Sequence, residues 1–285
     1  MSGTVPDAPS DVARHYGHAD LADRMIARLA EHGITPETAT LDDLAALDQM
    51  HLRGREATIE VGEKLGLKPG LSVLDLGSGI GGPARVLAAH FEVQVTALDL
   101  TPEFGATCAV LNEIAGLADR ITVVTGDATA TGLPDAAFDR VVTLHATMNI
   151  PDKAGVYREA YRCLKPGGLF AFYDVTAGPN GSPHFPVPWA GVPEISHLIP
   201  AEAMANMAEA AGFRRVEVTD LTEEARSRIA EQRAAAERQK AQNAKPPLQA
   251  GDILMGAQAA DKQRNLRRNL EEGRVAISMA VFVKG

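Results

Sequence analysis

The segment that decides the fold of this chain is residues 73–82, which read VLDLGSGIGG. A short apolar run with one acid breaks into four glycines within six residues. An apolar run bounded by glycine is typical of a buried strand in a parallel sheet. Gly77, Gly79 and Gly82 have the spacing G-x-G-x-x-G, and Pro83 suits the first turn of a helix. We therefore expect a strand, a glycine loop and a helix whose N–H groups face that loop.

Two acids stand at predicted strand ends. Asp75 precedes the first glycine by two residues, and Asp99 closes a second apolar run, twenty residues after Gly79. At that spacing an acid accepts hydrogen bonds from ribose hydroxyls. Two carboxylates favour a cationic ligand over a pyrophosphate, which points to S-adenosylmethionine (SAM), whose sulfonium and ammonium are positive. For the glycine pattern alone, the alternative is a tight strand-to-helix turn without a ligand.

Residues 73–82, Asp99 and the later Gly126-Asp127-Ala128 resemble the cofactor motifs of class I SAM-dependent methyltransferases. The resemblance covers most of residues 70–175. Within that superfamily the chain resembles the small-molecule branch that contains sarcosine/dimethylglycine N-methyltransferases and ubiquinone-type methyltransferases. It implies a Rossmann-like α/β fold with a seven-stranded, mostly parallel sheet, an antiparallel last strand and a helical cap. It also implies SAM as cofactor and a small-molecule methyl acceptor (an amine, a phenol or carboxylate, or an activated carbon).

Periodicity gives the order of the elements. Strands are expected at residues 73–76, 93–98, 121–125, 138–144, 169–175, 213–221 and 275–284, with helices between them. We divide the chain into a helical cap (1–68), a cofactor-binding core (69–221), a charged helical insertion or lid (222–273) and a final core strand (274–285). The insertion is a candidate cover for the site or a dimer interface, and the alternative for its charges is a solvated helix face.

The resemblance assigns the cofactor contacts. Asp99 is expected at the ribose, Asp127 at the adenine amino group, and Gly79 against the methionyl portion. The alternative for Asp127 is a plain loop aspartate. The full set of predicted cofactor-binding residues is Asp75, Gly77, Ser78, Gly79, Gly81, Asp99, Leu100, Asp127, Ala128, His145, His51 and Gly54.

Two catalytic candidates are His145, which follows the fourth predicted strand, and Tyr16 in the cap. Ligands bind beyond the carboxyl ends of strands in open α/β sheets, so His145 is placed to orient an acceptor or take a proton. The alternatives are a histidine bonded only to local backbone and a tyrosine in simple core packing. No strong base is required for an amine that binds deprotonated.

The predicted acceptor contacts come from three segments. In the methyltransferases that this chain resembles, the segment matching residues 48–54 folds over the methionine end of the cofactor. Residues 176–199 form a proline-rich loop with the only tryptophan, and a long ordered loop after a strand is usually functional. The alternatives are an interhelical turn and a rigid surface loop with Trp189 as its packing anchor. The substrate candidates are Gln49, His51, Trp189, Phe185 and Arg267.

Composition limits the other possibilities. The net charge of −9 disfavours binding to nucleic acid. No apolar run approaches the roughly 20 residues that span a bilayer, and the N-terminus lacks the pattern of a signal peptide. Neither of the two cysteines, Cys108 and Cys163, has other metal-binding residue types nearby in the sequence at the spacing of a metal site. We expect a cytoplasmic protein without a metal, without membrane or nucleic-acid partners, and with a homodimer as one possible state.

Two other functions compete with methyl transfer. Tyr161 and Lys165 match the Y-x-x-x-K pattern of short-chain dehydrogenases. However, Pro83 breaks the glycine pattern of that family, no serine lies about a dozen residues before Tyr161, and a second nucleotide-binding half is missing. An NAD(P)-dependent oxidoreductase is therefore disfavoured. A SAM-binding protein without catalysis, or a regulatory one, stays open until an acceptor is found.

Overall fold

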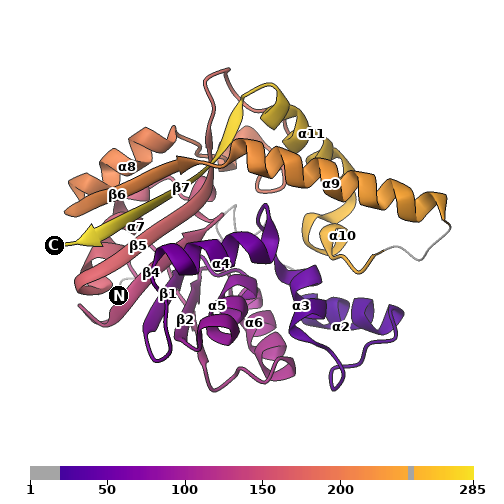
Figure 1. The fold of residues 1–285 in the computed structure, drawn as a ribbon, viewed down its shortest axis with the longest axis horizontal. Helices are drawn as coiled ribbons and strands as arrows, with labels where there is room; N and C mark the ends of the chain where they lie inside the picture. Colours follow the sequence, from indigo (N-terminus) through magenta and orange to yellow (C-terminus); the bar gives the residue numbers. More distant parts are fainter. Residues whose placement is uncertain (1–19, 243–246) are drawn as a thin grey trace, which may run out of the picture.

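A computed structural model describes residues 20–242 and 247–285 of the chain. Over these residues the chain forms one twisted, seven-stranded sheet with helices on both faces (Figure 1). The strands are β1 (Ser72–Leu76), β2 (Gln94–Asp99), β3 (Ile121–Thr125), β4 (Phe138–Leu144), β5 (Leu164–Ala177), β6 (Phe213–Asp220) and β7 (Val275–Lys284). Their order in the sheet is β3-β2-β1-β4-β5-β7-β6.

The pairing of the strands confirms the predicted fold. β1 pairs in parallel with both β2 and β4, β2 with β3, and β4 with β5. β7 is antiparallel to its two neighbours, β5 and β6. The predicted strand limits agree to within one or two residues except at β5. That strand begins at Leu164, because Leu164 already pairs with Phe138 before a bulge.

Helices cover the two faces of the sheet with two separate apolar clusters. α4 (Gly54–Lys64) and α5 (Gly82–Phe91) pack on one face, and α7 (Lys153–Cys163) and α8 (Ala201–Ala210) pack on the other. β1 shows why the strands are apolar throughout, since Val73 joins the first cluster and Leu74 the second. Because β1 to β5 are parallel, their carboxyl ends lie at the same edge of the sheet. The helices cover the two faces, and loops occupy this edge.

A third apolar cluster joins parts of the chain that are far apart in sequence. It combines the cap helices α2 (Leu21–Glu31) and α3 (Leu41–Asp48) with α6 (Pro102–Ile114) and α10 (Gly251–Met255). Its members include Leu47, Ile80 of the glycine loop and Ile253. Thr40 and Asp43 form a capping box that fixes the start of α3. The cap helices are thus packed on the core beside the glycine loop.

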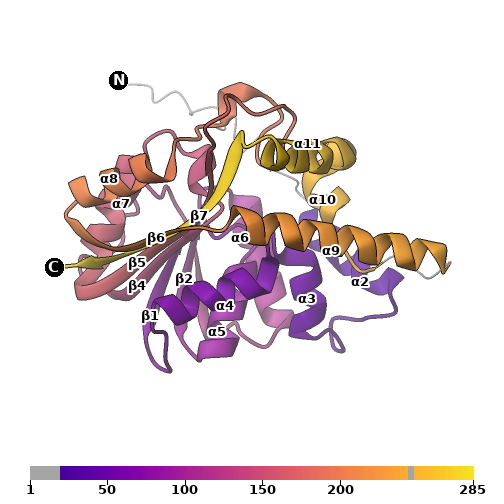
Figure 2. The same ribbon diagram turned by 45° about the horizontal axis from the view of Figure 1, so that its top comes forward.

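The segment between β6 and β7 is helical, as expected. It contains α9 (Thr222–Ala241), α10, a short 3-10 helix (Gly256–Gln258) and α11 (Ala259–Glu271). α9 crosses over the carboxyl edge of the sheet, and α10 and α11 return toward β7 (Figure 2). Two more 3-10 helices, η1 (Thr147–Asn149) and η2 (Pro193–Ile195), lie in loops at that edge. The division into cap, core and lid stays a prediction. None of the helices within the described residues is long and apolar enough to cross a bilayer.

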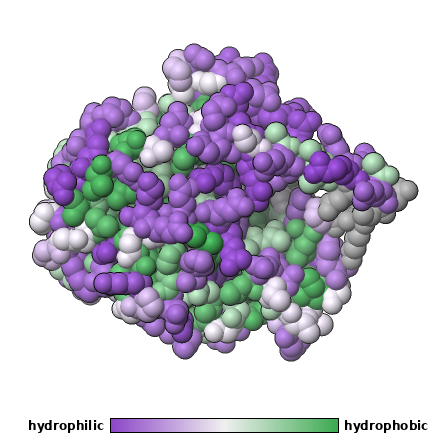
Figure 3. All heavy atoms as spheres, viewed as in Figure 1, coloured by the Kyte–Doolittle hydropathy of each residue, from purple (hydrophilic) through white to green (hydrophobic). Residues whose placement is uncertain are grey.

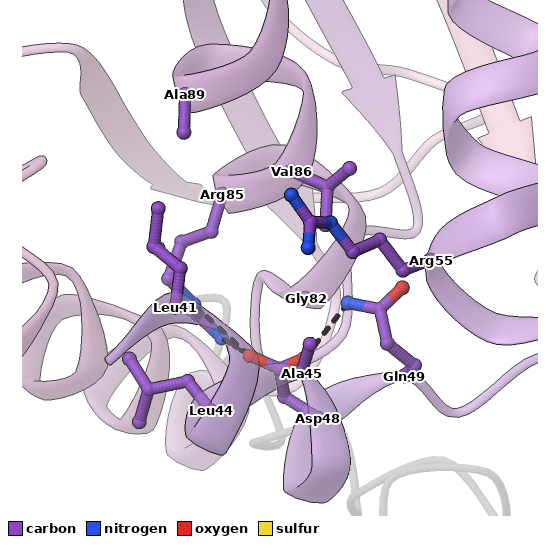
Figure 4. A pocket seen from close by; sticks show the side chains of 10 residues that line it. All are labelled: Leu41, Leu44, Ala45, Asp48, Gln49, Arg55, Gly82, Arg85, Val86 and Ala89. Carbon is purple, nitrogen blue, oxygen red and sulfur yellow. Dashed lines mark hydrogen bonds and ion pairs between the residues drawn. The ribbon is translucent and has the colours of Figure 1, made fainter. Parts of the chain in front are cut away.

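A buried ion pair fixes the end of α3 to the start of α5 (Figure 4). Nη2 of Arg85 donates to Asp48 Oδ2 at 2.8 Å, and both side chains are only 2% exposed. The same guanidinium donates to Asn112 Oδ1 at 2.8 Å and to the carbonyl of Ile80 at 2.7 Å. Burial raises the pKa of Asp48, and the charge and hydrogen bonds of Arg85 oppose that rise. The pair therefore joins the cap, the glycine loop and α6 through one cation.

Replacing Asp48 by Ala leaves the guanidinium of Arg85 buried without its counter-charge, so the free energy of unfolding should fall by about 3–5 kcal/mol. The double variant Asp48→Leu/Arg85→Met should recover part of that loss. The matched control is Arg158→Ala, which breaks an exposed pair with Asp152 and should cost less than about 1 kcal/mol. Urea unfolding followed by circular dichroism measures all three. Equal losses for the buried and the exposed pair would contradict this account.

Candidate active site

The glycine loop forms the floor of the site. Gly77 and Gly79 have φ of 78° and 56°, a region that residues with a side chain rarely adopt. The N–H groups of Gly77 and Ser78 both donate to the carbonyl of Leu98, at 2.8 and 3.0 Å. A Cβ on Gly77 would lie 2.4 Å from that of Ala146, whereas one on Gly79 would have only Met50 Sδ within 4 Å, at 3.8 Å. The loop is thus pinned to β2 and packs closely on the segment after β4, whereas at Gly79 the described residues leave room for a side-chain carbon.

Two carboxylates lie beside this loop. Asp75 is 1% exposed, and neither of its oxygens has a hydrogen-bond partner among the described residues. Burial, followed by the charge of Asp99, raises its pKa to about 7. Asp99 accepts hydrogen bonds from the N–H groups of Gly79 at 2.8 Å and Thr101 at 2.9 Å, and burial is the main cause of its raised pKa. A buried carboxylate without a partner fits a positively charged ligand.

Three other predicted cofactor residues on this side, Leu100, Asp127 and Ala128, lie on loops. Leu100, directly after Asp99, is 45% exposed. Asp127 Oδ1 accepts from the N–H and the hydroxyl of Thr129, both at 2.8 Å, and Ala128 is buried. Asp127 Oδ2 accepts no hydrogen bond from the described residues, so the carboxylate keeps acceptor capacity. Leu100 offers an apolar surface next to it.

On the other side of the loop three rings meet: His51, His145 and Tyr173. The ring centres of His145 and Tyr173 are 5.0 Å apart, and that of His51 lies 5.9 and 6.0 Å from them. Burial lowers the pKa of His51 to about 4. Burial, and the repulsion that a protonated His51 would add, lower the pKa of His145 well below its ordinary value. Both imidazoles are therefore neutral at physiological pH.

In a neutral imidazole one ring nitrogen donates a hydrogen bond and the other accepts one, so the contacts of His51 and His145 show which nitrogen does which. Nε2 of His51 lies 2.9 Å from the carbonyl of Gly54, so it carries the proton and donates. Thr58 Oγ1 is 3.0 Å from the same nitrogen and can donate onward to Gln49 Oε1 at 3.4 Å. Nε2 of His145, in contrast, is buried and has no hydrogen-bond partner among the residues that the structure describes.

His145 is also held in a strained conformation. Its φ is 49°, in the left-handed region that a side chain disfavours. Its N–H donates to the carbonyl of Tyr173 at 2.7 Å, which holds it in place at the end of β4. Strain of this kind in a non-glycine residue is found most often at functional sites.

Tyr173 fastens the predicted segment 48–54 to the sheet. Its hydroxyl donates to the carbonyl of Leu52 at 3.0 Å, and burial raises its pKa, so it stays a neutral donor. Arg53 has φ of 62°, lies beside the Tyr173 hydroxyl and binds Glu60 at 2.6 Å. Sequence reasoning missed Tyr173. Its signal is positional, because Tyr173 of β5 pairs with Leu144, the last residue of β4 and the one directly before His145.

The proline-rich loop is anchored to the same edge. Trp189 is 2% exposed and its indole donates to Ser196 Oγ at 3.0 Å. Asn149 donates to the carbonyls of Trp189 at 2.8 Å and Ile195 at 2.9 Å, and Phe185 is half-buried against the same cluster. Trp189 is thus placed as a packing anchor of the loop, and its contact with an acceptor stays a prediction, as does that of Phe185.

Two predicted residues are not joined to this group. Arg267 lies 3.6 Å from Glu271 on its own helix, so the insertion itself provides its counter-charge. Tyr16 falls outside the described residues. Among the described residues, no group of three or more His, Cys, Asp or Glu side chains is arranged to hold a metal ion. The structure therefore brings together Asp75, Asp99, His51 and His145 around the glycine loop, with Tyr173 as an addition.

Comparisons with known proteins identify a family for part of the chain. Residues 74–172 match the family described as "Methyltransferase domain". Sterol 24-C-methyltransferase ERG6B of Gibberella zeae is 40% identical over 110 residues, which are 39% of this chain and 29% of that protein. The chain therefore matches about three tenths of the length of that relative.

Two solved structures share the fold. A putative sarcosine dimethylglycine methyltransferase from Galdieria sulphuraria has a TM-score of 0.63 at 21% identity, covering 81% of this chain and 85% of that one. Phosphoethanolamine N-methyltransferase 2 of Haemonchus contortus has a TM-score of 0.68 at 20% identity, covering 91% and 60%. Residues 74–172 are thus a methyltransferase domain, and the described fold is that of the class I methyltransferases.

Proposed function

We propose that the chain transfers the methyl group of SAM to a small-molecule acceptor. The observation that carries this proposal is the buried carboxylate of Asp75, which has no described partner and lies beside a glycine loop where the described residues leave room at Gly79. A cationic cofactor would supply the missing partner. The match of residues 74–172 to a methyltransferase domain and the named relatives support the same function.

The residues present fit SAM. Asp75 would face the positive groups, Asp99 has acceptor capacity left for ribose hydroxyls, and Leu100 and Asp127 would offer an apolar surface and a carboxylate to the adenine. His51 and Gly54 would close the methionyl end. When bound, the cofactor supplies a methyl group on a positively charged sulfur.

The acceptor would bind on the other side of the glycine loop, against His145. A neutral imidazole with a free Nε2 can accept a hydrogen bond or a proton from the acceptor, or donate one to orient it. His51 and Tyr173 fix the position of this ring. Positioning of two reactants is worth roughly 7–11 kcal/mol in favourable cases, and the covering segment 48–54 excludes water from the reacting atoms.

The competing functions predict different ligands. In the dinucleotide-binding fold the sheet has the order 3-2-1-4-5-6, whereas here β7 enters antiparallel between β5 and β6. This topology disfavours an NAD(P)-dependent oxidoreductase. A non-catalytic SAM-binding protein would bind SAM but transfer no label to any acceptor. A homodimer stays a prediction.

Asp99→Ala should weaken SAM binding by about 1–3 kcal/mol, since polar groups of the ligand lose their acceptor. Isothermal titration calorimetry with SAM measures the change, and NADPH serves as the negative control for the wild-type chain. Circular dichroism checks that the variant is folded. An unchanged dissociation constant in a folded variant would remove Asp99 from the cofactor site.

The raised pKa of Asp75 predicts that the stability of the fold depends on pH. Its pKa of about 7 in the folded chain lies above the value of about 3.9 of a free aspartate. A raised pKa means that the carboxyl group stabilises the fold fully below about pH 4 and that this contribution is lost as pH rises through about 7. Without ligand, Asp75→Asn should therefore melt at a higher temperature than the wild type at about pH 8, with a difference that shrinks toward pH 4.

SAM should reverse this order at about pH 8, because only the ionised carboxylate of the wild type pairs with the positive cofactor. Differential scanning fluorimetry of both proteins, with and without SAM across this pH range, measures the effect. A difference in melting temperature that does not change with pH would contradict the assignment.

His145→Ala should reduce kcat by about 10²- to 10⁴-fold if the ring exchanges a proton with the acceptor, and by less if it only orients it. The SAM dissociation constant should change little in either case. The acceptor for this measurement comes from a mass-spectrometric screen of amines, carboxylates, phenols and isoprenoid diphosphates with methyl-labelled SAM. Thr129→Ala, on the adenine side, is the matched control for kcat. Full turnover by the His145 variant would place the acceptor elsewhere.

A further inference from the structure

Met50 is an exposed sulfur-containing side chain in segment 48–54. It is 39% exposed, whereas its neighbours in the segment are held in place: Asp48 by its buried ion pair, and His51 by its hydrogen bond to the carbonyl of Gly54. Exposure alone does not distinguish Met50, because apolar residues reach the surface in several patches on the face seen in Figure 3. Its position beside the glycine loop does.

The thioether of Met50 lies over Gly79. Its sulfur is 3.8 Å from the position that a Cβ on Gly79 would take, and it is the only atom of the described residues within 4 Å of that position, apart from those of the chain neighbours of Gly79. The N–H of Gly79 donates to Asp99 at 2.8 Å, so the sulfur lies beside the residue that contacts one of the two site carboxylates. A ligand that rests on Gly79, as expected for the methionyl portion of SAM, would meet this thioether.

The other methionines in the described part of the chain do not combine exposure with a place at the glycine loop. Four are buried, with 0–6% exposed: Met25, Met148, Met204 and Met279. Met255 is half-buried at the end of α10. Met207 is 37% exposed, but it lies on α8, on the opposite side of the molecule from α3 and segment 48–54 (Figures 1 and 2). Met207 is therefore a matched exposed sulfur away from the site.

The two thiols of the chain do not compete with Met50 for an oxidant. Cys108 and Cys163 are both 0% exposed, and burial raises the pKa of each thiol. Oxidation of cysteine requires exposure and thiolate character, and both are missing here. A peroxide that reaches the glycine loop therefore meets the thioether of Met50 and no reactive thiol.

We propose that Met50 is an oxidation site that controls the binding of the cofactor. A hydroperoxide transfers one oxygen atom to Sδ: its O–O bond breaks, an S–O bond forms, and the thioether is oxidised to a sulfoxide. The hydroperoxide is reduced to an alcohol, or to water if it is hydrogen peroxide. Methionine sulfoxide reductases reverse the change. This inference rests on the proposed function, because the ligand that Met50 contacts is SAM.

Oxidation alters the surface that Met50 offers to the ligand. A thioether is apolar and adapts to its neighbours, whereas a sulfoxide is polar and larger by one oxygen. A sulfoxide that stays over Gly79 takes space that the ligand needs, and one that turns to solvent leaves the ligand uncovered. The segment cannot shift to relieve either state, because Asp48 and His51 are anchored. SAM binding is weakened, and bound SAM in turn shields the thioether from the oxidant.

The test treats the full chain with hydrogen peroxide, with and without SAM, and follows the oxidation of each methionine by peptide mass spectrometry. Without SAM, Met50 and Met207 should be oxidised at similar rates, since 39% and 37% of their surfaces are exposed. SAM at about ten times its dissociation constant leaves roughly a tenth of the protein free, so it should slow the oxidation of Met50 about 10-fold. The rate at Met207 should not change.

Calorimetry with SAM, after the peroxide is removed, gives the second readout. Oxidised wild type and oxidised Met207→Leu should bind SAM about 10- to 100-fold more weakly than before treatment, the range expected when binding leaves a polar group without a partner. Treatment should not change the affinity of Met50→Leu. Met50→Gln, which places a polar group there without an oxidant, should show the loss untreated. Methionine sulfoxide reductase should restore the wild type, and circular dichroism checks the fold of each sample.

Three results would overturn the inference: normal SAM affinity with Met50 fully oxidised, no protection of Met50 by SAM, or an equal loss of affinity in peroxide-treated Met50→Leu. Tighter SAM binding by Met50→Ala would mean that the thioether blocks the loop instead of lining it, and would overturn the inference as well. If the untreated wild type does not bind SAM, the proposed function itself fails, which is a separate result from SAM binding that is insensitive to peroxide.

Discussion

The structure depends on the buried contact between Asp48 and Arg85. The guanidinium binds the end of α3, the carbonyl of Ile80 in the glycine loop and Asn112 of α6, all from the first turns of α5. The fit is close, because a Cβ on Gly82 would lie 2.3 Å from the carbonyl oxygen of Asp48. Segment 48–54 begins with Asp48 itself. It cannot move away from the site without exposing the charge of Arg85 to solvent or leaving it buried without its partner. The cover of the site on this side is therefore part of the packed core.

A second buried polar group fixes the opposite wall. Asp174, at the end of β5, accepts from the N–H of Thr147 at 2.9 Å and from its hydroxyl, and burial raises its pKa to about 6. Lys153 donates to the carbonyls of Ile150 at 2.9 Å and His197 at 2.6 Å, which joins η1 to the end of the proline-rich loop. His145 lies between these anchors and the glycine loop. Its left-handed backbone is held because the segments on both sides of it are fixed.

The fold and the glycine loop were predictable because their signals are local. Apolar runs, glycines at a fixed spacing and an acid at the end of the next strand are all read along the chain, and the sheet and its order confirm the fold. Contacts between residues that are far apart in the sequence leave no such local pattern along the chain. Arg85 follows the glycine loop in an ordinary helical stretch, and Lys262 is one of many charges in the insertion, yet both are buried. Tyr173 lies in an apolar strand run, where an aromatic residue is typical of a core.

The charges around the opening form an ordered sequence, and this order constrains how a ligand can lie in it. Two carboxylates, Asp75 and Asp99, lie beside the glycine loop, and two neutral imidazoles, His51 and His145, lie on its other side. Charge interactions are strong where burial lowers the effective dielectric constant, so a negative ligand group placed beside the two carboxylates meets repulsion. The neutral centre is where a methyl acceptor needs an uncharged lone pair, since protonation would remove its nucleophile. Low pKa values at His51 and His145 keep that centre free of charge, so the two imidazoles orient the acceptor by hydrogen bonds and packing while the two carboxylates hold the positive charge of the cofactor.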